Sequence, residues 1–309
     1  MNTDWITPET LARFAAEGTD LHRLYTGSRG WIERYGADLL FCLQQPGWPD
    51  DTTELRADLR HWQAHAHFTP GRIFVKTLRQ GPGAEKYTLL EGDPALPLQT
   101  VCTEAGLKYK IDFDAGYSTG FFIDQRENRR FLRALKPKNL LNLFAYTCSF
   151  SVAAASVGAE TTSIDVAKKA LDWGRENFAL NGLELTPPAT HRFWPDDVRD
   201  VLRRQQQRGA KFAVIILDPP TFARNQKGKA FRVTDELPEL TRQALPLLEP
   251  GGHLLLSTNC ERLIETDLAD WAEDAARAEG RKLEKVEIPA LEDIPAGHGA
   301  ITHWVKRLD

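Results

Sequence analysis

Two acidic residues, each following an apolar run, are well placed to do chemistry in this chain. Asp165 closes the stretch NLLNLFAYTCSFSVAAASVGAETTSID, and Asp218 follows the run FAVIIL. The first stretch has the order of a βαβ unit: an apolar strand, a small polar turn, a helix ended by Gly158, and a second strand. Such a turn brings backbone N–H groups and a helix start against a ligand, and the later acid can accept hydrogen bonds from a ribose diol. The pattern predicts a nucleoside site, although an isolated Asp after a strand more often caps the next helix.

The segment Asp218-Pro219-Pro220-Thr221-Phe222 is the second informative motif. Two prolines cannot continue a strand and present donor-free carbonyl groups, while the phenylalanine offers a flat apolar face. Enzymes that modify a base take it out of its stack, and stacking on an aromatic ring contributes about 1–3 kcal/mol per base. A strand terminator with a buried Phe is the alternative interpretation. The base-binding interpretation is favoured because strands one and four flank the ligand site of a doubly wound sheet.

Two further polar segments are candidates for the same site. Asp196 and Asp197 follow the expected third strand, ATHRF, where an acid can accept from the amine of an adenine, or both acids can simply begin a helix. Gln125 and Arg126 begin a helix expected to run to Leu135. Arg126 is either a bidentate partner of a ligand carboxylate or a solvated charge.

The pattern of the remaining elements predicts two domains. Helices are expected at Pro8–Glu17 and Thr52–His65, and from Arg72 the pattern changes to strands that predict a small antiparallel sheet, with a hairpin around Ala105-Gly106. Strands and helices then alternate, which indicates an α/β domain with a parallel sheet. We expect an N-terminal α+β domain over residues 1–122 and an α/β domain over residues 123–309.

Composition limits the partners. The chain of 309 residues lacks an apolar run near the roughly 18 residues that span a bilayer, and its N-terminus does not resemble a signal peptide, so a cytoplasmic protein without a membrane partner is expected. Four scattered cysteines predict reduced thiols, with no disulfide and no metal site. With a net charge of −4, nucleic acid would have to bind at local basic patches. The two candidate clusters are Arg224, Lys227, Lys229 and Arg232, and Arg126, Arg129, Arg130, Arg133, Lys136 and Lys138.

The segments NLFAYTCSFSVAAASVGA, SID, DDV, LDPPTF and GFFIDQRENR together resemble the S-adenosylmethionine-dependent methyltransferases that modify bases of large-subunit ribosomal RNA, of the cytosine-C5 and guanine-N7 types. The resemblance spans roughly residues 72–309. It implies a class I methyltransferase (Rossmann-like) sheet of seven strands with the last antiparallel, preceded by a small β-rich α+β domain. It also implies S-adenosylmethionine as cofactor and RNA, 23S rRNA or a ribosomal precursor, as partner. A homodimer is one expectation for an oligomeric state that the sequence leaves open.

The resemblance also implies roles for individual residues. The turn Asn142–Ser149 would surround the methionine part of the cofactor, Asp165 the ribose and Asp197 the adenine, while the segment from Asp218 to Phe222 would lie at the methyl group and target base. The family's turn usually carries Gly where this chain has Cys148, and a Cβ there narrows the approach or forbids a positive φ. The cofactor-binding residues it implies are Gln125, Arg126, Asn142, Phe144, Ala145, Tyr146, Thr147, Ser149, Asp165, Val166, Asp196, Asp197, Val198 and Asp218. The catalytic residues it implies are Asp218, Pro219, Pro220, Phe222 and Cys260.

Cys260 bears on the choice of base. Cytosine C5 is a poor nucleophile, and its methylation needs a thiolate to add at C6, whereas guanine N7 can attack directly once it is positioned. Cys260 follows the strand GHLLLS at the position of the catalytic cysteine of the C5 type, with Arg262 and Arg126 as candidates to stabilise a thiolate. The alternative is a small residue at a strand end. LDPPTF and the segment IFVKTL…EKYTLL look closer to the guanine-N7 type, so the base stays open.

Three other functions stay open beside a base methyltransferase. A nicotinamide-dependent oxidoreductase would share the βαβ unit, but GxGxxG does not occur at the turn. A noncatalytic RNA-binding protein with a decayed cofactor site is suggested by Cys148. A small-molecule methyltransferase is suggested by the first seventy residues, which show no RNA-binding module.

Overall fold

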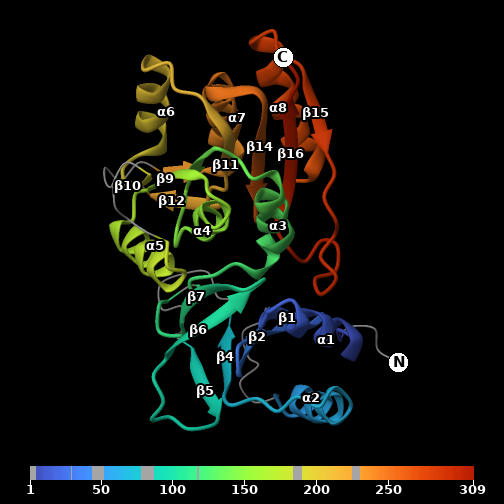
Figure 1. Cartoon of the computed structure of the whole chain (residues 1–309). Coiled ribbons are helices and arrows are strands. Elements are labelled where there is room, and N and C mark those ends of the chain that lie inside the picture. The colour runs from blue at the N-terminus through green and yellow to red at the C-terminus, as the bar shows by residue number, and fades with distance from the viewer. Residues whose placement is uncertain are drawn as a thin grey trace. The chain divides into compact units, whose positions relative to one another are not determined.

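The computed structural model divides into two compact units, which are described separately below (Figure 1). The first unit comprises Met1–Arg126 and Ala290–His298, and the second comprises Glu127–Pro289 and Gly299–Asp309. No pattern in the sequence indicated that residues 290–298 would join the first unit. The structure describes the whole chain except residues 1–4, 29, 44–51, 78–86, 117, 184–189 and 225–229.

A largely parallel sheet forms the centre of the second unit. Its strand order is β10-β9-β8-β11-β14-β16-β15. The neighbours from β10 to β14 are parallel, whereas β16 runs antiparallel to both β14 and β15. These strands are β8 (Asn139–Leu143), β9 (Glu160–Asp165), β10 (His191–Pro195), β11 (Phe212–Leu217), β14 (Leu248–Thr258), β15 (Leu283–Val286) and β16 (Ile301–Arg307).

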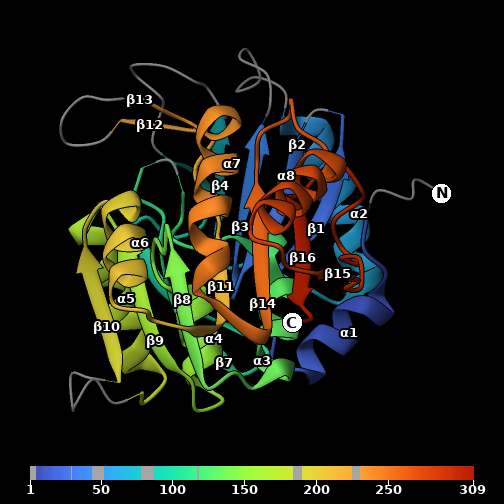
Figure 2. The same cartoon turned by 90° about the horizontal axis from the view of Figure 1, so that it is seen from above.

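Helices cover both faces of this sheet because apolar side chains point alternately to its two sides. Leu141 and Leu143 pack in one core cluster with α6, α7 and α8, whereas Leu140 packs in another with α3 and α4. Figure 2 shows α6, α7 and α8 in front of the strands. The structure therefore confirms the expected α/β fold. The helices are α3 (Arg126–Leu135), α4 (Ser149–Ala155), α5 (Lys168–Leu180), α6 (Val198–Gln207), α7 (Val233–Ala244) and α8 (Glu265–Ala278).

A mixed sheet of order β1-β2-β3-β4-β5 forms the centre of the first unit. Its strands are β1 (Leu21–Gly27), β2 (Gly30–Tyr35), β3 (Asp38–Leu43), β4 (Ile73–Thr77) and β5 (Thr88–Glu91). The unit also contains helices α1 (Pro8–Ala16) and α2 (Thr52–Ala66) and a separate hairpin of β6 (Gln99–Glu104) and β7 (Leu107–Asp112).

The sequence predictions for this unit are partly confirmed. Both helices and the hairpin around Ala105-Gly106 are present. The predicted strands pair antiparallel, β4 with β5 and β6 with β7, but the prediction of one small antiparallel sheet is wrong because the two pairs lie in separate sheets. An additional strand, β3, pairs with β4 in parallel. Helix α2 lies between these two strands in the chain, and a connection of this kind is the one that allows neighbouring strands to be parallel. Across the described residues, none of the helices is long and apolar enough to cross a membrane.

Candidate active site

The strand order brings the two predicted acids to one edge of the sheet. β8 lies between β9 and β11, and the three strands are parallel. Asp165 is the last residue of β9, and Asp218 directly follows β11. Neighbouring strands are about 4.8 Å apart, so these two positions are separated by roughly 10 Å across the sheet. Asp196, after β10, joins the same edge because its backbone N–H donates to the carbonyl oxygen of Asp165 at 3.2 Å.

The carboxylate of Asp165 organises the turn that follows β8. Oδ2 accepts from the backbone N–H of Tyr146 at 2.9 Å, and Oδ1 accepts from that of Ala167 at 2.8 Å. Burial raises the pKa of Asp165 above its ordinary value of 3.8, and these two N–H groups oppose that rise. The N-cap residue of α5 is Ala167, so the interpretation of Asp165 as the cap of that helix is wrong. Beside it, the apolar side chain of Val166 is 42% exposed.

Three residues of the turn adopt a left-handed backbone without being glycine. The φ angles are 61° at Phe144, 47° at Tyr146 and 63° at Cys148. A non-glycine residue in this region costs about 1–3 kcal/mol, and such residues gather at functional sites. The expectation that the Cβ of Cys148 forbids a positive φ is therefore wrong for this turn. Backbone hydrogen bonds from Ala145 to Ile164 and from Cys148 to Ala145, both 2.8 Å, hold the conformation.

The thiol of Cys148 is buried and does not open onto the surface. Burial raises its pKa to about 12, so the thiol is protonated at neutral pH. The nearest position on α5 is Gly174, where a Cβ would lie 2.4 Å from the sulfur. One helical turn later, Nδ2 of Asn177 donates to the carbonyl oxygen of Thr147 at 2.9 Å. No sequence motif indicated either residue as part of the site.

Several other residues predicted to bind the cofactor are buried in the core. Asn142 is buried and donates from Nδ2 to Oγ of Ser151 at 2.9 Å, and Ser151 hydrogen-bonds Ser163 at 2.8 Å. This chain joins β8, α4 and β9. Ala145, Thr147 and Val198 are also buried, whereas Phe144, Tyr146 and Ser149 are half-buried. Whether each of these residues contacts a cofactor stays a prediction.

The acids after β10 have partners of their own. Asp197 is the N-cap of α6, where Oδ1 accepts from the backbone N–H of Arg199 at 2.9 Å and Oδ2 pairs with its guanidinium at 3.3 Å. Asp196 accepts from the backbone N–H of Asp197 at 2.8 Å and pairs with Arg204. Arg199 also holds Glu236 of α7 at 2.9 and 2.7 Å. The helix-start interpretation is thus confirmed, and a contact with adenine stays a prediction.

A short hairpin follows the Asp-Pro-Pro segment. It consists of β12 (Phe222–Arg224) and β13 (Ala230–Arg232), paired antiparallel. The buried ring of Phe231 lies 5.5 Å from that of Phe144 and 5.8 Å from the guanidinium of Arg199. Phe231 therefore joins the hairpin to the turn and to the start of α6, a role that no sequence motif indicated.

The described part of the DPPTF segment changes from buried to exposed along the chain. Asp218 is half-buried, Pro219 is buried, and Pro220 and Thr221 are exposed. The side chain of Phe222, and with it the expected stacking surface, lies outside what the structure describes. So do the side chain of Arg224 and residues Lys227 and Lys229.

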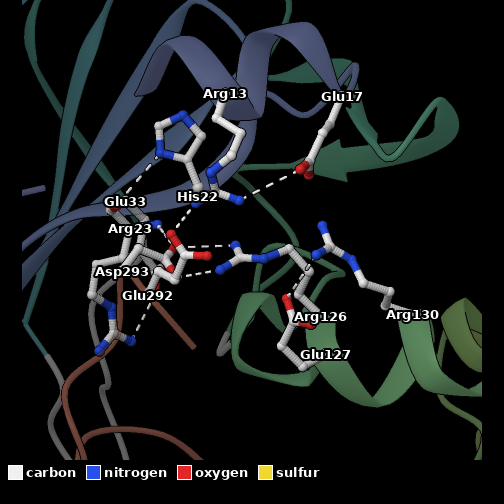
Figure 3. A network of polar contacts seen from close by, with 10 residues as sticks. All are labelled: Arg13, Glu17, His22, Arg23, Glu33, Arg126, Glu127, Arg130, Glu292 and Asp293. Carbon is white, nitrogen blue, oxygen red and sulfur yellow. Dashed lines mark hydrogen bonds and ion pairs between the residues drawn. The ribbon is translucent and has the colours of Figure 1, made fainter. Parts of the chain in front are cut away.

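The first unit holds the other two predicted cofactor residues, Gln125 and Arg126, which are both buried. Figure 3 shows Arg126 and Asp293 pointing toward each other. One guanidinium nitrogen of Arg126 donates to Oδ2 of Asp293 at 3.1 Å, a second pairs with Oδ1, and the group lies 4.5 Å from the ring of Phe14. The solvated-charge interpretation of Arg126 is wrong, and a contact with the cofactor stays a prediction.

The basic cluster expected around α3 is smaller than its sequence suggests. Arg126 and Arg129 are buried, and the guanidinium of Arg129 lies 5.9 Å from the ring of Phe150. Arg130 pairs with Glu127 at 3.7 Å. Lys136 and Lys138 are exposed, and the ammonium group of Lys138 pairs with Glu249 at 2.6 Å.

Cys260 lies two residues beyond the end of β14, a neighbour of β11 in the sheet. Its side chain is 5% exposed and packs in the core cluster of the second unit. Its backbone N–H donates to Oγ1 of Thr258 at 3.1 Å. Arg262 is exposed, and the guanidinium of Arg126 is paired with Asp293. A nucleophilic role for Cys260 stays a prediction.

Comparison with known proteins identifies the family of this chain. Residues 20–299 match the model of the S-adenosylmethionine-dependent methyltransferase family. The chain belongs to this family. A ribosomal RNA large subunit methyltransferase I of Serratia proteamaculans (strain 568) is 33% identical over 89% of this chain and 69% of the relative. A protein of the same name from Klebsiella pneumoniae (strain 342) is 40% identical over 57% of this chain and 44% of the relative.

Solved structures agree with this family. The crystal structure of SMU.776, described as a methyltransferase complexed with SAH, has a TM-score of 0.79 and 27% identity, and it covers 96% of this chain and 78% of the other. The chain spans a little under half the length of several of the curated relatives it matches, 44% of the Klebsiella pneumoniae relative among them.

The residues at the sheet edge fit S-adenosylmethionine. Burial raises the pKa of Asp165, and ribose hydroxyl groups would supply donors that compensate the desolvation of its carboxylate. The exposed apolar side chain of Val166 offers a surface for a purine. The strained turn between Phe144 and Cys148 has the backbone conformation expected of a ligand-binding segment.

Proposed function

We propose that this chain transfers a methyl group from S-adenosylmethionine to a base of RNA, with large-subunit ribosomal RNA as the substrate. One observation carries the proposal: Asp165 and Asp218 end parallel strands on either side of β8, at the edge where the strained turn lies. A parallel sheet binds its ligand at this edge. The names of the relatives from Serratia proteamaculans and Klebsiella pneumoniae support the choice of ribosomal RNA.

We assign each part of the cofactor to the segment at the end of one strand. When bound, S-adenosylmethionine supplies a methyl group activated by its sulfonium charge. Asp165 accepts hydrogen bonds from the ribose hydroxyl groups, and the turn from Phe144 to Ser149 holds the methionine part. The segment after β10, with Asp196 and Asp197, borders the adenine.

The target base is assigned to the segment after β11. The peptide groups that follow Asp218 and Pro219 lack an N–H donor, so at these positions the backbone offers only carbonyl groups. They and the Asp218 carboxylate are the acceptors proposed to hold the edge of an extracted base, and Phe222 is proposed to stack on it. With the base fixed in line with the methyl group, positioning alone can supply a large part of the rate.

The role of Cys260 depends on which atom of the base receives the methyl group. If cytosine C5 is the target, the Cys260 thiolate would add to C6 and C5 would accept the methyl group. Loss of the C5 proton to a base would then break the S–C6 bond and release the thiolate. If guanine N7 is the target, no covalent step is needed. The side chain of Cys260 is only 5% exposed and belongs to a core cluster. The covalent route therefore requires the base to reach a sulfur atom that is almost buried.

Transfer of a labelled methyl group tests the proposal. The chain is incubated with S-adenosylmethionine and with unmodified large-subunit and small-subunit ribosomal RNA, and nuclease fragments are mapped by mass spectrometry. We expect one methylated base in the large-subunit RNA, lost in Asp218→Ala and retained in Asp200→Ala, a control at an exposed position of α6. Methylation of neither RNA by the wild-type chain would reject the proposed substrate.

The route is tested in the same assay with Cys260→Ser. Cytosine C5 methylation through a covalent adduct predicts that the variant loses transfer, by several orders of magnitude, because serine is a weaker nucleophile at C6. Full activity of this variant would exclude Cys260 as the nucleophile and favour guanine N7.

A further inference from the structure

One face of α5 supports the turn that carries the three left-handed residues. Gly174 and Asn177 lie about one helical turn apart, and both are buried. A Cβ added at Gly174 would meet Cys148 and Thr147, and Asn177 hydrogen-bonds the carbonyl group of Thr147. Helix α4 and strand β9 lie between the turn and this helix along the chain, so the contact is a tertiary one.

Gly174 is required by the side chain of Cys148. A Cβ at position 174 would lie 2.4 Å from Sγ, 2.9 Å from Cβ of Cys148 and 3.5 Å from the carbonyl carbon of Thr147. Contacts below 3.0 Å are essentially never made by real Cβ atoms, so one of the two residues would have to move. Glycine is an unfavourable residue inside a helix, which indicates that packing rather than helix propensity explains its presence here.

Asn177 fixes the same segment by a hydrogen bond. Its amide Nδ2 donates to the carbonyl oxygen of Thr147 at 2.9 Å, and its side chain is fully buried. A buried carbonyl group that loses its donor carries a desolvation cost, so this bond selects one orientation of the peptide between Thr147 and Cys148. That peptide immediately precedes the residue with φ of 63°.

We propose that Gly174 and Asn177 are positioning residues for the cofactor turn. Because Gly174 has no side chain, α5 leaves room for the side chain of Cys148, and the turn can carry cysteine at this position in place of glycine. Asn177 holds the adjoining peptide in the matching orientation. The inference rests on the proposed role of the turn in cofactor binding, and it adds α5 to the residues that determine cofactor affinity.

Adding a methyl group at position 174 and removing the side chain at position 148, separately and together, tests this steric coupling. We compare the affinity for S-adenosylhomocysteine by calorimetry in the wild type, Gly174→Ala, Cys148→Gly and the double variant, with Glu176→Ala on the exposed face of α5 as control. Gly174→Ala is expected to weaken binding about tenfold or more. The double variant is expected to return to within about threefold of the wild type, because the new methyl group occupies the space left by the thiol.

The outcomes separate the two proposals. Wild-type affinity in Gly174→Ala, or a double variant that binds as weakly as Gly174→Ala, would overturn the coupling while leaving the cofactor site intact. If the wild-type chain itself fails to bind S-adenosylhomocysteine, the proposed cofactor site is wrong, and this inference with it. Should Gly174→Ala not fold, the double variant must still fold and bind, and its failure to do so would count against the proposal.

A second measurement distinguishes positioning from general stability. Asn177→Ala is expected to weaken S-adenosylhomocysteine binding about tenfold. Asn177→Asp, which keeps the shape but loses the amide donor, is expected to weaken it as much, whereas Asn181→Ala, one turn further along α5, is expected to leave it unchanged. If the thermal midpoint of the ligand-free protein falls in the two Asn177 variants while their affinity does not, Asn177 is only a structural residue.

Discussion

At the scale of single residues, Asp165 combines two tasks. Each of its carboxylate oxygens accepts one backbone N–H, which leaves acceptor capacity on both oxygens. The same side chain can therefore hold the turn at Tyr146 and accept a hydrogen bond from a ligand. Burial raises the pKa of this carboxyl group, so a ligand that donates hydrogen bonds would restore its charged form.

The affinity for S-adenosylhomocysteine should depend on the protonation of Asp165. Because the pKa of Asp165 is raised above 3.8 and the ribose favours the charged carboxylate, binding should be constant above that pKa and weaken as the pH falls through it. Calorimetry over a pH series measures this. Asp165→Asn should bind about 10–100-fold more weakly near neutral pH and lose the pH dependence.

Asp172→Asn is the matched control, since the side chain of this acid on α5 is 44% exposed and pairs with Lys168 at 2.7 Å. The prediction fails if Asp165→Asn keeps the wild-type pH profile.

Individual residues also show where sequence reasoning ends. The acids at the strand ends could be predicted because an apolar strand followed by an acid is a local pattern. The left-handed conformation of Cys148 could not be predicted, because it depends on Gly174 of another element. Arg126 was assigned by its position in a helix start, whereas its buried partner Asp293 is 167 residues away in the chain.

At the scale of elements, the hairpin of β12 and β13 is connected to the site by one ring. Phe231 contacts Phe144 of the turn and the guanidinium of Arg199, which in turn pairs with Asp197. The segment proposed to hold the base is thus packed against the two segments proposed to hold the cofactor.

Phe231→Ala should impair methyl transfer more than cofactor binding. Truncation of a buried Phe costs about 3–5 kcal/mol locally, and here that loss falls on the packing of the hairpin. We expect transfer to ribosomal RNA to decrease about tenfold or more, with a smaller decrease in affinity for S-adenosylhomocysteine.

Steady-state rates and calorimetry compare the variant with Phe231→Leu, which keeps an apolar side chain and should stay within about threefold of the wild type. Unchanged transfer in Phe231→Ala would show that the hairpin does not depend on this contact.

The elements of the second unit were more predictable than those of the first. Strand β11 is a continuous apolar run and β8 is apolar except for Asn139 and Asn142, a pattern that follows from burial on both faces of a parallel sheet. Strands β1 and β2 bury His22, Arg23 and Glu33, so their sequences lack the apolar alternation by which strands are recognised. The polar groups are compatible with burial because Arg23 pairs with Glu33 at 3.2 Å.

At the scale of the whole molecule, the first unit contains a buried polar network that includes Asp293 of the segment 290–298. Asp293 accepts from the backbone N–H of Arg23 at 2.8 Å and pairs with Arg126 (Figure 3). His22 is adjacent in the chain and fully buried, and burial lowers its pKa to about 3. The network thus includes an imidazole that is neutral in the folded state.

Acidification should therefore destabilise the chain through His22. The unfolded imidazole titrates near 6.5 and the folded one near 3, so the stabilisation is present above 6.5 and is lost as the pH falls toward 3. We expect His22 to contribute a loss of about 2 kcal/mol between about pH 7 and about pH 5.

Urea unfolding at the two pH values measures this loss. His22→Phe should reduce the difference by about that amount, while His298→Gln, at an exposed position, should not change it. An unchanged pH dependence in His22→Phe would contradict the prediction.

The central claim is that the ends of β9 and β11 border one ligand site. A crystal structure of the chain with S-adenosylhomocysteine tests it most directly. We predict that the Asp165 carboxylate lies within hydrogen-bonding distance, about 2.6–3.2 Å, of a ribose hydroxyl group, with the thioether sulfur directed toward Asp218. A nucleoside bound away from Asp165, or a sulfur directed away from the Asp218 segment, would contradict the account.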